Sequence, residues 1–477
     1  MDDAPGNQDR ADLMNFSEIP VFELRKENFE KILPYLLVCI KEADLVALDL
    51  EMSGLGPHGT RSKDTEQRYA AFRESAATRG ILSLGIATFK NTEADEEGKV
   101  LKYQSHVFNI LTYPNTPFTI EPGAMEFLVR HGFDFNKVVG QGVMYHPQKF
   151  DKDCPLRRIF TTILLARKPV ALHNGWLDMC FLYQQLYTPL PEKLKDFLAA
   201  LSELFPPESA LIDSKYLAEY TTRMKGSFLE YVFRRCQRDN VYEAFKNRAC
   251  IEVHFPEVAK LMRAMRKSLE TTNCALPQDF PDHVIPVDLK THVCQQYVQH
   301  GFCRTKGCTK LHDVDFALDI ETMAAMKGRK RRIKRYEHIT SSVKTSVEDE
   351  DKAEVSVVSC TVILANAAPP AKRTATVAEV TERKPRIAVH GSHRAGVDAF
   401  MTGFSVLFQD RMSLLRTRKF NPENLSMFPL SGKPFPLKVL KENQAELPDD
   451  HVIRFKHIQK DRVALDEVPS NSMAMEE

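Results

Sequence analysis

The 477-residue sequence lacks any hydrophobic run near the ~18 residues that a membrane-spanning helix needs. Its apolar stretch Ile159–Ala166 is interrupted by two threonines and followed by Arg167. The first residues, Met1–Pro5, are acidic and contain no apolar core, so we expect no secretory signal. These absences predict an intracellular, soluble protein with no membrane partner.

The sequence also lacks an excess of either charge, because 65 Lys and Arg face 64 Asp and Glu. Hydrophobic residues at 43% and charged residues at 27% are close to the globular average, which excludes collagen, coiled coils and wholesale disorder. In a reducing compartment, the ten cysteines favour metal ligation over disulfides. We expect Cys39, Cys180 and Cys236, which lie in apolar surroundings, to be buried thiols.

Hydrophobic periodicity predicts a mixed α/β fold. The expected helices are Asn28–Lys41, Pro155–Arg167, Asn174–Leu186, Lys215–Tyr220 and Gly226–Arg235. The expected strands are Leu45–Glu51, Gly80–Phe89, Ser105–Ile110, Pro169–Leu172 and Ala210–Asp213. Strands that come first, followed by alternating strands and helices, indicate a mixed sheet covered by helices.

Two acids stand in the otherwise apolar first strand of this pattern. Asp49 and Glu51 are two residues apart, so both side chains leave the same face of the strand. Two neighbouring buried carboxylates repel each other, and a metal ion relieves that cost. The alternative is an edge strand whose acidic face is simply solvated.

Two later segments carry further candidate ligands. Asp178 follows the strand-to-helix junction that begins at His173, about one turn into the expected helix. His393 and Asp398 are five residues apart, which is ~140° around a helix, so we expect His393 on the preceding loop and Asp398 within the helix. The ordinary alternatives are an acid at a helix start for Asp178 and capping roles for the other two.

Together these segments resemble the DEDDh exonucleases, and they look most like the deadenylase branch that contains poly(A)-specific ribonuclease. Leu48–Gly56, Leu172–Tyr183 and His393–Gly403 carry the resemblance, which covers about Phe22–Phe408. It implies a ribonuclease-H-like fold and an enzyme that removes adenosines from the 3′ end of RNA with an oligo(A) or poly(A) tail, releasing 5′-AMP.

The chemistry of the residues agrees with the resemblance. Asp49, Glu51, Asp178 and Asp398 could hold two Mg²⁺ ions, with Mn²⁺ as the alternative, ~4 Å apart across a phosphodiester. His393 would act as the general base on water. Asp213, in a segment that also resembles the family, is interpreted as a buried acid satisfied by backbone donors rather than as a catalytic one. Trp176 is interpreted as core rather than as a stacking platform.

A second metal motif lies between the second and third segments. Cys294, Cys303, Cys308 and His312 form Cys-x8-Cys-x4-Cys-x3-His, the CCCH pattern of a structural Zn²⁺ site. Residues 285–315 have too little apolar content to fold without the metal. Aromatic and basic residues between the ligands are candidates for binding single-stranded RNA: Tyr297, Phe302, Arg304, Lys306 and Lys310. The alternative for the two rings is that they only pack around the zinc.

Positive charge is concentrated after the finger. Residues 290–335 contain eleven Lys or Arg and four Asp or Glu, although the whole chain has a formal charge of +1. The segment 327–335 is predicted to be a nuclear localisation signal, a phosphate-binding patch, or both, through Lys327, Arg329, Lys330, Arg331, Arg332, Lys334 and Arg335. A solvated linker is the alternative.

With the finger inserted, the chain is similar to a nuclear deadenylase of this branch. The resemblance implies location in the nucleus, including Cajal bodies and nuclear speckles, and nuclear small RNAs as substrates. The expected parts are a disordered tail (1–20), an exonuclease domain in two pieces (21–275 and 386–440), the finger (285–315), the basic signal (327–335), a disordered linker (340–385) and a C-terminal tail (441–477). Two alternatives stay open: a CCCH RNA-binding adapter with an inactive nuclease fold, and a DNA-directed DEDDh exonuclease. Protein partners and oligomeric state are not indicated by the sequence.

Overall fold

The structure is a computed structural model that describes residues 13–56, 62–92, 98–147, 154–277, 280, 293–325, 394–430 and 432–466. The chain divides into two compact units. The first contains Met1–Leu276 and Pro385–Glu477, and the second contains Pro277–Lys384. No helix among the described residues is long and apolar enough to cross a membrane.

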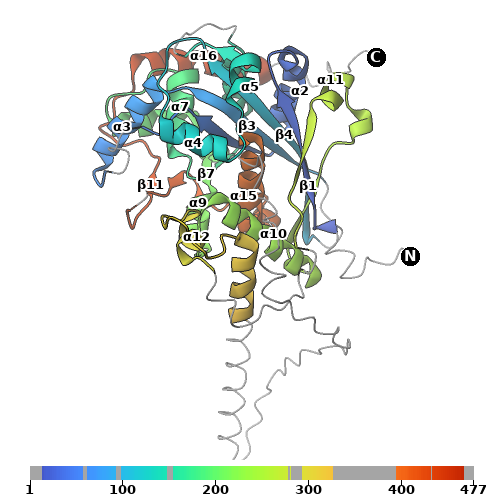
Figure 1. The fold of residues 1–477 in the computed structure, drawn as a ribbon. Coiled ribbons are helices and arrows are strands. Elements are labelled where there is room, and N and C mark those ends of the chain that lie inside the picture. The colour runs from blue at the N-terminus through green and yellow to red at the C-terminus, as the bar shows by residue number, and fades with distance from the viewer. Residues whose placement is uncertain are drawn as a thin grey trace, which may run out of the picture. The chain divides into compact units, whose positions relative to one another are not determined.

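A mixed β-sheet forms the centre of the first unit (Figure 1). Its strands are β1 (Glu18–Leu24), β2 (Leu45–Met52), β3 (Ile81–Asn91), β4 (Val100–Pro114), β5 (Val143–Tyr145), β6 (Val170–Leu172), β7 (Leu211–Asp213), β8 (Cys250–His254) and β9 (Leu269–Asn273). The order is β7-β6-β2-β3-β4-β1-β9, and β5 and β8 also pair with β4. Strands β2, β3 and β4 are antiparallel neighbours, whereas β6 and β1 run parallel to β2 and β4.

The two-residue period of β2 sends its apolar side chains into two separate cores. Leu48 and Leu50 pack in one core with helix α2 (Phe29–Glu42). Ala47 packs in the other core with helix α15 (Ala395–Thr417). The sheet is therefore covered on both faces, as the sequence predicted for the fold class.

The remaining helices are assigned to these layers by their contacts. The core that contains α2 also includes residues of α3 (Thr65–Thr78), α6 (Pro155–Ala166), α7 (Trp176–Leu186), α8 (Leu194–Leu204), α11 (Arg263–Lys267) and α16 (Asp449–Asp466). The core beneath α15 includes residues of α9 (Ser214–Tyr216) and α10 (Leu229–Phe245). The other short elements are α4 (Pro122–Arg130), α5 (Phe135–Gln141), β10 (Met427–Phe428), β11 (Leu437–Lys438) and, in the second unit, α12 (Gln295–His300).

Helix α15, the long orange helix in Figure 1, lies very close to the sheet. A Cβ on Gly85 of β3 would lie 1.8 Å from the carbonyl oxygen of Ala395, and one on Gly403 would lie 2.2 Å from the Phe89 ring. Glycine is therefore needed both on the strand, at Gly85, and on the helix, at Gly403, because any side chain there would push the helix off the sheet.

The predicted strands and helices occur at their expected places, with some longer than expected. Strand β4 extends beyond the predicted Ser105–Ile110, and α10 continues ten residues past Arg235 to Phe245. The helix predicted for Lys215–Tyr220 is a short α-helical turn followed by a π-helical turn, Leu217–Thr221.

Two predictions for the ends of the first unit are wrong in part. The disordered tail predicted for residues 1–20 is too long, because β1 begins at Glu18 and Ile19 is fully buried. The tail predicted for 441–477 contains α16, which packs on α6, buries Ile458 in the core and donates from Arg462 Nη2 to the Leu164 carbonyl at 2.6 Å. The pattern missed this helix because its packed side also includes polar His451 and Arg462.

Candidate active site

Asp49 and Glu51 leave β2 on the same face, the one that α15 covers. Across the strand pair, Asp49 is opposite Gly85 and Glu51 is opposite Ser83. Glu51 is 9% exposed and Asp49 is half-buried. The edge-strand alternative is wrong, since β2 has β6 on one side and β3 on the other.

Asp398 reaches the same place from the first turn of α15 and is 5% exposed. One carboxylate oxygen each of Asp49, Glu51 and Asp398 lies within 4.8 Å of the others. The start of the helix is held by Asn109 of β4, whose Oδ1 accepts the backbone N–H of Gly396 at 3.1 Å. Residues about 350 positions apart in the chain thus meet through the close approach at Gly85.

Asp178 lies beside this group, in the first turn of α7. Burial raises its pKa to about 7, although its carboxylate accepts backbone N–H groups of Asp178 itself and Leu50. The pKa of Asp49 is raised well above its ordinary range, first by burial and then by the negative charges of Asp398, Asp178 and Glu51. All four predicted carboxylates are therefore electrostatic neighbours.

Four carboxylates in one partly buried place repel one another, and no Lys or Arg is among the largest influences on Asp49. The donor set contains only oxygen, which hard cations such as Mg²⁺ and Mn²⁺ prefer. A divalent cation would supply the missing positive charge. The residues that are present therefore fit a metal of this type.

Asp213 supports the site from the end of β7. Its carboxylate accepts four backbone N–H groups at 2.9–3.1 Å: those of Asn174, Gly175, Lys215 and Tyr216. Burial raises its pKa to about 6 despite these bonds. Asn174 adopts φ 56°, a left-handed conformation that asparagine tolerates better than most residues. Asp213 thus fixes the turn before α7, as the interpretation of a backbone-satisfied acid predicted.

The loop after β2 is held by a residue that the sequence patterns did not reveal. Glu121 accepts the backbone N–H groups of Leu55 and Gly56 at 3.2 and 2.9 Å, and it pairs with Arg79 at 3.0 Å. A Cβ on Gly54 would lie 2.5 Å from the Glu121 carboxyl carbon. No local signal marks Glu121, because its partners are far away in the chain.

The sequence patterns did not identify Asn109 as a site residue either, although its position in the sequence indicates a structural role. It is a lone amide within the apolar run Val107–Leu111, and it is 4% exposed. A buried polar side chain in such a run requires a hydrogen-bond partner. Here the partners are Ser83, Gly396 and Glu23.

The predicted base, His393, lies outside the described residues. The next residue, Arg394, is the N-cap of α15. Trp176 is 5% exposed and packs against Phe197 and Phe428, which supports the core interpretation. Cys39, Cys180 and Cys236 are buried free thiols, as predicted.

In the second unit, ligand atoms of Cys294, Cys303, Cys308 and His312 all lie within 4.8 Å of one another. Helix α12 lies in the first interval and is followed by its C-cap Gly301 with φ 74°, and Val293 pairs with Leu311. A hydrogen bond from the Thr305 backbone lowers the pKa of the Cys303 thiol, which favours the thiolate that zinc binds. Three thiols and one imidazole fit a closed tetrahedral Zn²⁺ site.

The two aromatic candidates of the finger differ in environment. Tyr297 stacks on the His312 ring, with centroids 4.9 Å apart, so it packs around the ligands. Phe302 is 49% exposed, and the Arg304 guanidinium lies 5.4 Å from its ring centre. Lys306 and Lys310 are exposed. The basic segment 327–335 and the linker 340–385 lie outside the described residues.

A mixed α/β sheet with acids clustered on one face of its central strand β2 defines a ribonuclease-H-like nuclease fold, into which the Cys/His module is inserted. The match to known proteins makes the class specific. Residues 24–155 and 146–406 match the family described as "CAF1 family ribonuclease", and the chain belongs to that family.

Three similar proteins illustrate the likeness. The poly(A)-specific ribonuclease PARN of Danio rerio is 29% identical over 144 residues, which are 28% of this chain and 22% of that protein. The poly(A)-specific ribonuclease PNLDC1 of Mus musculus is 28% identical over 138 residues, 26% of this chain and 25% of that protein. The match thus spans about a quarter of these relatives. A Mg²⁺- and Mn²⁺-bound structure of S. pombe Pop2p aligns with a TM-score of 0.36 and 17% identity, over 46% of this chain and 82% of that one.

Proposed function

We propose that this chain is a metal-dependent 3′-to-5′ exoribonuclease that removes adenosines from RNA tails and releases 5′-AMP. One observation carries the proposal: oxygens of Asp49, Glu51 and Asp398 lie within 4.8 Å of one another, with Asp178 beside them. These four side chains would hold two divalent ions. When bound, the ions activate water as a nucleophile and neutralise charge on the phosphodiester.

The protein's own groups have separate roles in this proposal. Asp178 and Asp398 are fixed by helix starts, and Asp49 and Glu51 by the central strand, so the four carboxylates are held in place before substrate binds. His393 is proposed to take the proton of the attacking water. Asp398 lies within the first turn of α15.

Two kinds of support favour an RNA tail as substrate. The chain belongs to a ribonuclease family, and the two matched relatives are both named for poly(A). The Cys/His module adds an exposed aromatic ring with Arg304 beside it, which is suited to stacking on unpaired bases. We extend the proposal to one structural Zn²⁺ in this module and to nuclear small RNAs as substrates.

The proposal is tested with 3′-extended substrates labelled at the 5′ end: oligo(A) RNA, RNA of mixed sequence, and the DNA equivalent of oligo(A). We expect stepwise shortening of oligo(A) RNA in Mg²⁺, with 5′-AMP as the product. We expect no shortening in EDTA. Equal shortening of DNA would support a DNA-directed exonuclease instead. Binding of RNA without shortening in Mg²⁺ or Mn²⁺ would support the inactive adapter.

Nuclear location is proposed from the basic segment 327–335. Changing Lys330, Arg331 and Arg332 to Gln should move the protein to the cytoplasm while preserving oligo(A) shortening in vitro. The matched control changes three other basic residues to Gln: Arg416, Arg418 and Lys419. They lie close together in the sequence at the end of α15 and just after it. Continued nuclear accumulation of the first variant would contradict the proposal for this segment.

A further inference from the structure

A row of paired residues crosses the sheet from β2, which carries Asp49, through β3 and β4 to β1. Asp49 is opposite Gly85, Gly85 is opposite Asn109, and Asn109 is opposite Glu23. Strands are about 4.8 Å apart, so Glu23 on β1 lies three strand spacings, about 14 Å, from Asp49 on β2. The start of α15 lies over the middle of the row, at Gly85 and Asn109.

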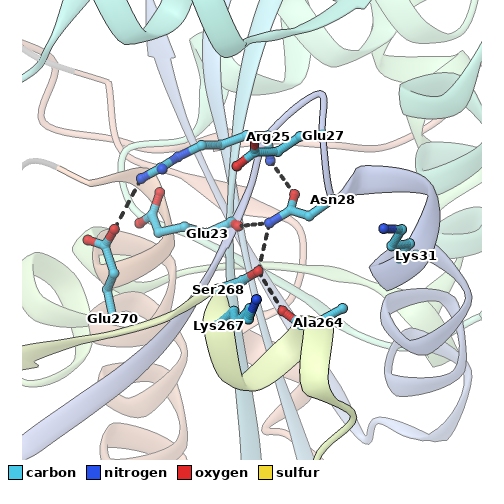
Figure 2. A pocket seen from close by; sticks show the side chains of 9 residues that line it. All are labelled: Glu23, Arg25, Glu27, Asn28, Lys31, Ala264, Lys267, Ser268 and Glu270. Atoms are coloured by element: carbon cyan, nitrogen blue, oxygen red, sulfur yellow. Dashed lines mark hydrogen bonds and ion pairs between the residues drawn. The ribbon is translucent and has the colours of Figure 1, made fainter.

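Two cavities meet at the Glu23 end of this row. The larger measures about 340 Å³ and is lined by residues of β1, α2, α11 and β9 (Figure 2). The smaller measures about 80 Å³ and includes Ser83, the residue opposite Glu51. Both are lined by Glu23, Arg25 and Glu270. The cavities therefore extend from the vicinity of the carboxylates toward α2.

Glu23 is a buried acid with one unused oxygen. Its side chain belongs to a residue that is 6% exposed. The Oε2 atom accepts a hydrogen bond from Asn109 Nδ2 at 3.0 Å. The Oε1 atom has no hydrogen bond and lies 3.5 Å from Arg394 Nη1. Arg25 Nε and Arg394 Nη1 are also buried without a hydrogen bond. Both guanidinium groups are held by Glu270, at 3.1 and 2.8 Å. Buried polar atoms of both kinds thus converge without hydrogen-bonding partners, which is uncommon in a folded protein.

The mixture of groups restricts what could bind. A phosphate has acceptors alone, so it would be repelled by the Glu23 carboxylate. A hydroxyl can donate to Glu23 Oε1 and accept from a guanidinium N–H in the same position. The larger cavity adds Lys31 and Lys267, which are suited to neutralising phosphates on either side of such a hydroxyl. A ribose within an RNA strand has this arrangement.

We propose that the site formed by Glu23, Arg25 and Arg394, the ribose site, binds the 2′-hydroxyl of an RNA nucleotide upstream of the 3′ end. This rests on the proposed function, because the strand is placed with its 3′ end at the carboxylates. The 2′-hydroxyl is the group by which a protein distinguishes RNA from DNA at a given position. The ribose site would thus make the enzyme selective for RNA, although the carboxylates act on a phosphodiester of either kind.

The experiment uses the whole 477-residue chain and oligo(A) RNA substrates in which a single ribose is replaced by 2′-deoxyribose, one position at a time from the 3′ end. For wild type, we expect one upstream position at which the replacement slows removal of the terminal nucleotide about ten-fold, the size expected for a hydrogen bond to a charged group. In Glu23→Gln, which keeps the size of the side chain, that ratio should fall below about two-fold. Glu30→Gln, an exposed acid on α2, is the control and should keep the wild-type ratio.

The readout is a ratio of rates for two substrates on one protein, so a general loss of activity cancels. A merely structural Glu23 would slow both substrates equally, and that result would overturn the proposal. Absence of a sensitive position upstream in wild type would overturn it as well. If Glu23→Gln does not fold, Arg25→Gln replaces it and should reduce the same ratio. Failure of wild type to shorten any RNA would instead refute the proposed exoribonuclease, a separate result.

Discussion

Asp49 shares a small space with three other acids, and their charges together with burial raise its pKa. Without a cation, ionising this group costs free energy in the folded protein that the unfolded chain does not have. The residues that would hold the metal therefore destabilise the metal-free fold.

Replacing Asp49 and Glu51 with Ala together should abolish exonuclease activity and leave the fold intact. In EDTA the double variant should melt at or above the wild-type temperature, because the repulsion has been removed, and Mg²⁺ should no longer raise its melting temperature. Activity assays and thermal melts with and without Mg²⁺ check this. Glu30→Ala with Glu192→Ala, two exposed acids, is the matched control. Exonuclease activity retained by the Asp49/Glu51 variant would refute the two-metal proposal.

Among the elements, α15 decides whether the site forms, because it brings Asp398 to β2. Its approach depends on Gly85, where an added Cβ would overlap the Ala395 carbonyl. The contact is backbone on backbone, so no side chain can rotate away to make room.

We expect Gly85→Ala to lower the stability by about 3 kcal/mol and to lower kcat at least about ten-fold by displacing Asp398. Denaturant unfolding and single-turnover assays measure the two effects. Gly123→Ala in α4 is the control, since a Cβ there meets nothing within 4 Å and alanine favours the helix. Wild-type stability and activity in Gly85→Ala would show that α15 tolerates a shift.

One buried imidazole, that of His451, joins helix α16 to the rest of the first unit. His451 has a fully buried side chain, and its Nε2 lies 3.2 Å from Glu203 Oε2 while its Nδ1 lies 3.2 Å from the Tyr187 hydroxyl. Burial lowers its pKa below the ordinary value of 6.5, and this outweighs the opposite influence of Glu203. The folded state therefore binds a proton less readily than the unfolded chain, so the contribution of His451 to stability is complete above pH 6.5 and declines as the pH falls below it.

His451→Phe should lower the stability by about 1–3 kcal/mol at pH 8, where the hydrogen bonds of His451 are fully effective. The difference from wild type should shrink at pH 5.5, because wild type loses stability on acidification and the variant lacks that titrating group. Thermal melts across this pH range test the prediction. His457→Phe, exposed on the same helix, should behave like wild type. If the difference in stability between wild type and His451→Phe grew at low pH, the prediction would be wrong.

For the whole molecule, the division into two units separates the two candidate metal groups. The carboxylates all belong to the first unit, and the Cys/His module belongs to the second. Among the described residues, the group of carboxylates contains no residue of the module.

Cys303→Ser should release the module's Zn²⁺ and unfold it, since one lost ligand is enough in a segment with little apolar core. Shortening of a short oligo(A) should stay within a few-fold of wild type. Binding to a long structured RNA should weaken and depend less on salt, provided that Arg304, Lys306 and Lys310 contact phosphates. Metal analysis, activity assays and salt titrations test these effects, with Gln299→Ala as the control. Loss of short-substrate activity from an otherwise folded enzyme would show that the module is part of the catalytic domain.

The sequence by itself determined the features that depend on local spacing. The two-residue period of a strand puts Asp49 and Glu51 on one face, and the spacing in the third segment predicted Asp398 within a helix, where α15 has it. The Cys-x8-Cys-x4-Cys-x3-His spacing likewise sufficed to select four residues that meet. Such patterns are readable because the geometry that they describe spans only a few residues.

The tertiary structure alone decided which distant elements meet. Asn109 and Arg394 both reach Glu23 only because β1 pairs with β4 and the start of α15 lies over β3 and β4. Glu121 holds the loop after β2 from a different element, and α16 docks through a half-polar side that no hydrophobic period reveals. These contacts depend on close packing between segments far apart in the chain, and the energy of such packing leaves no regular spacing in the sequence.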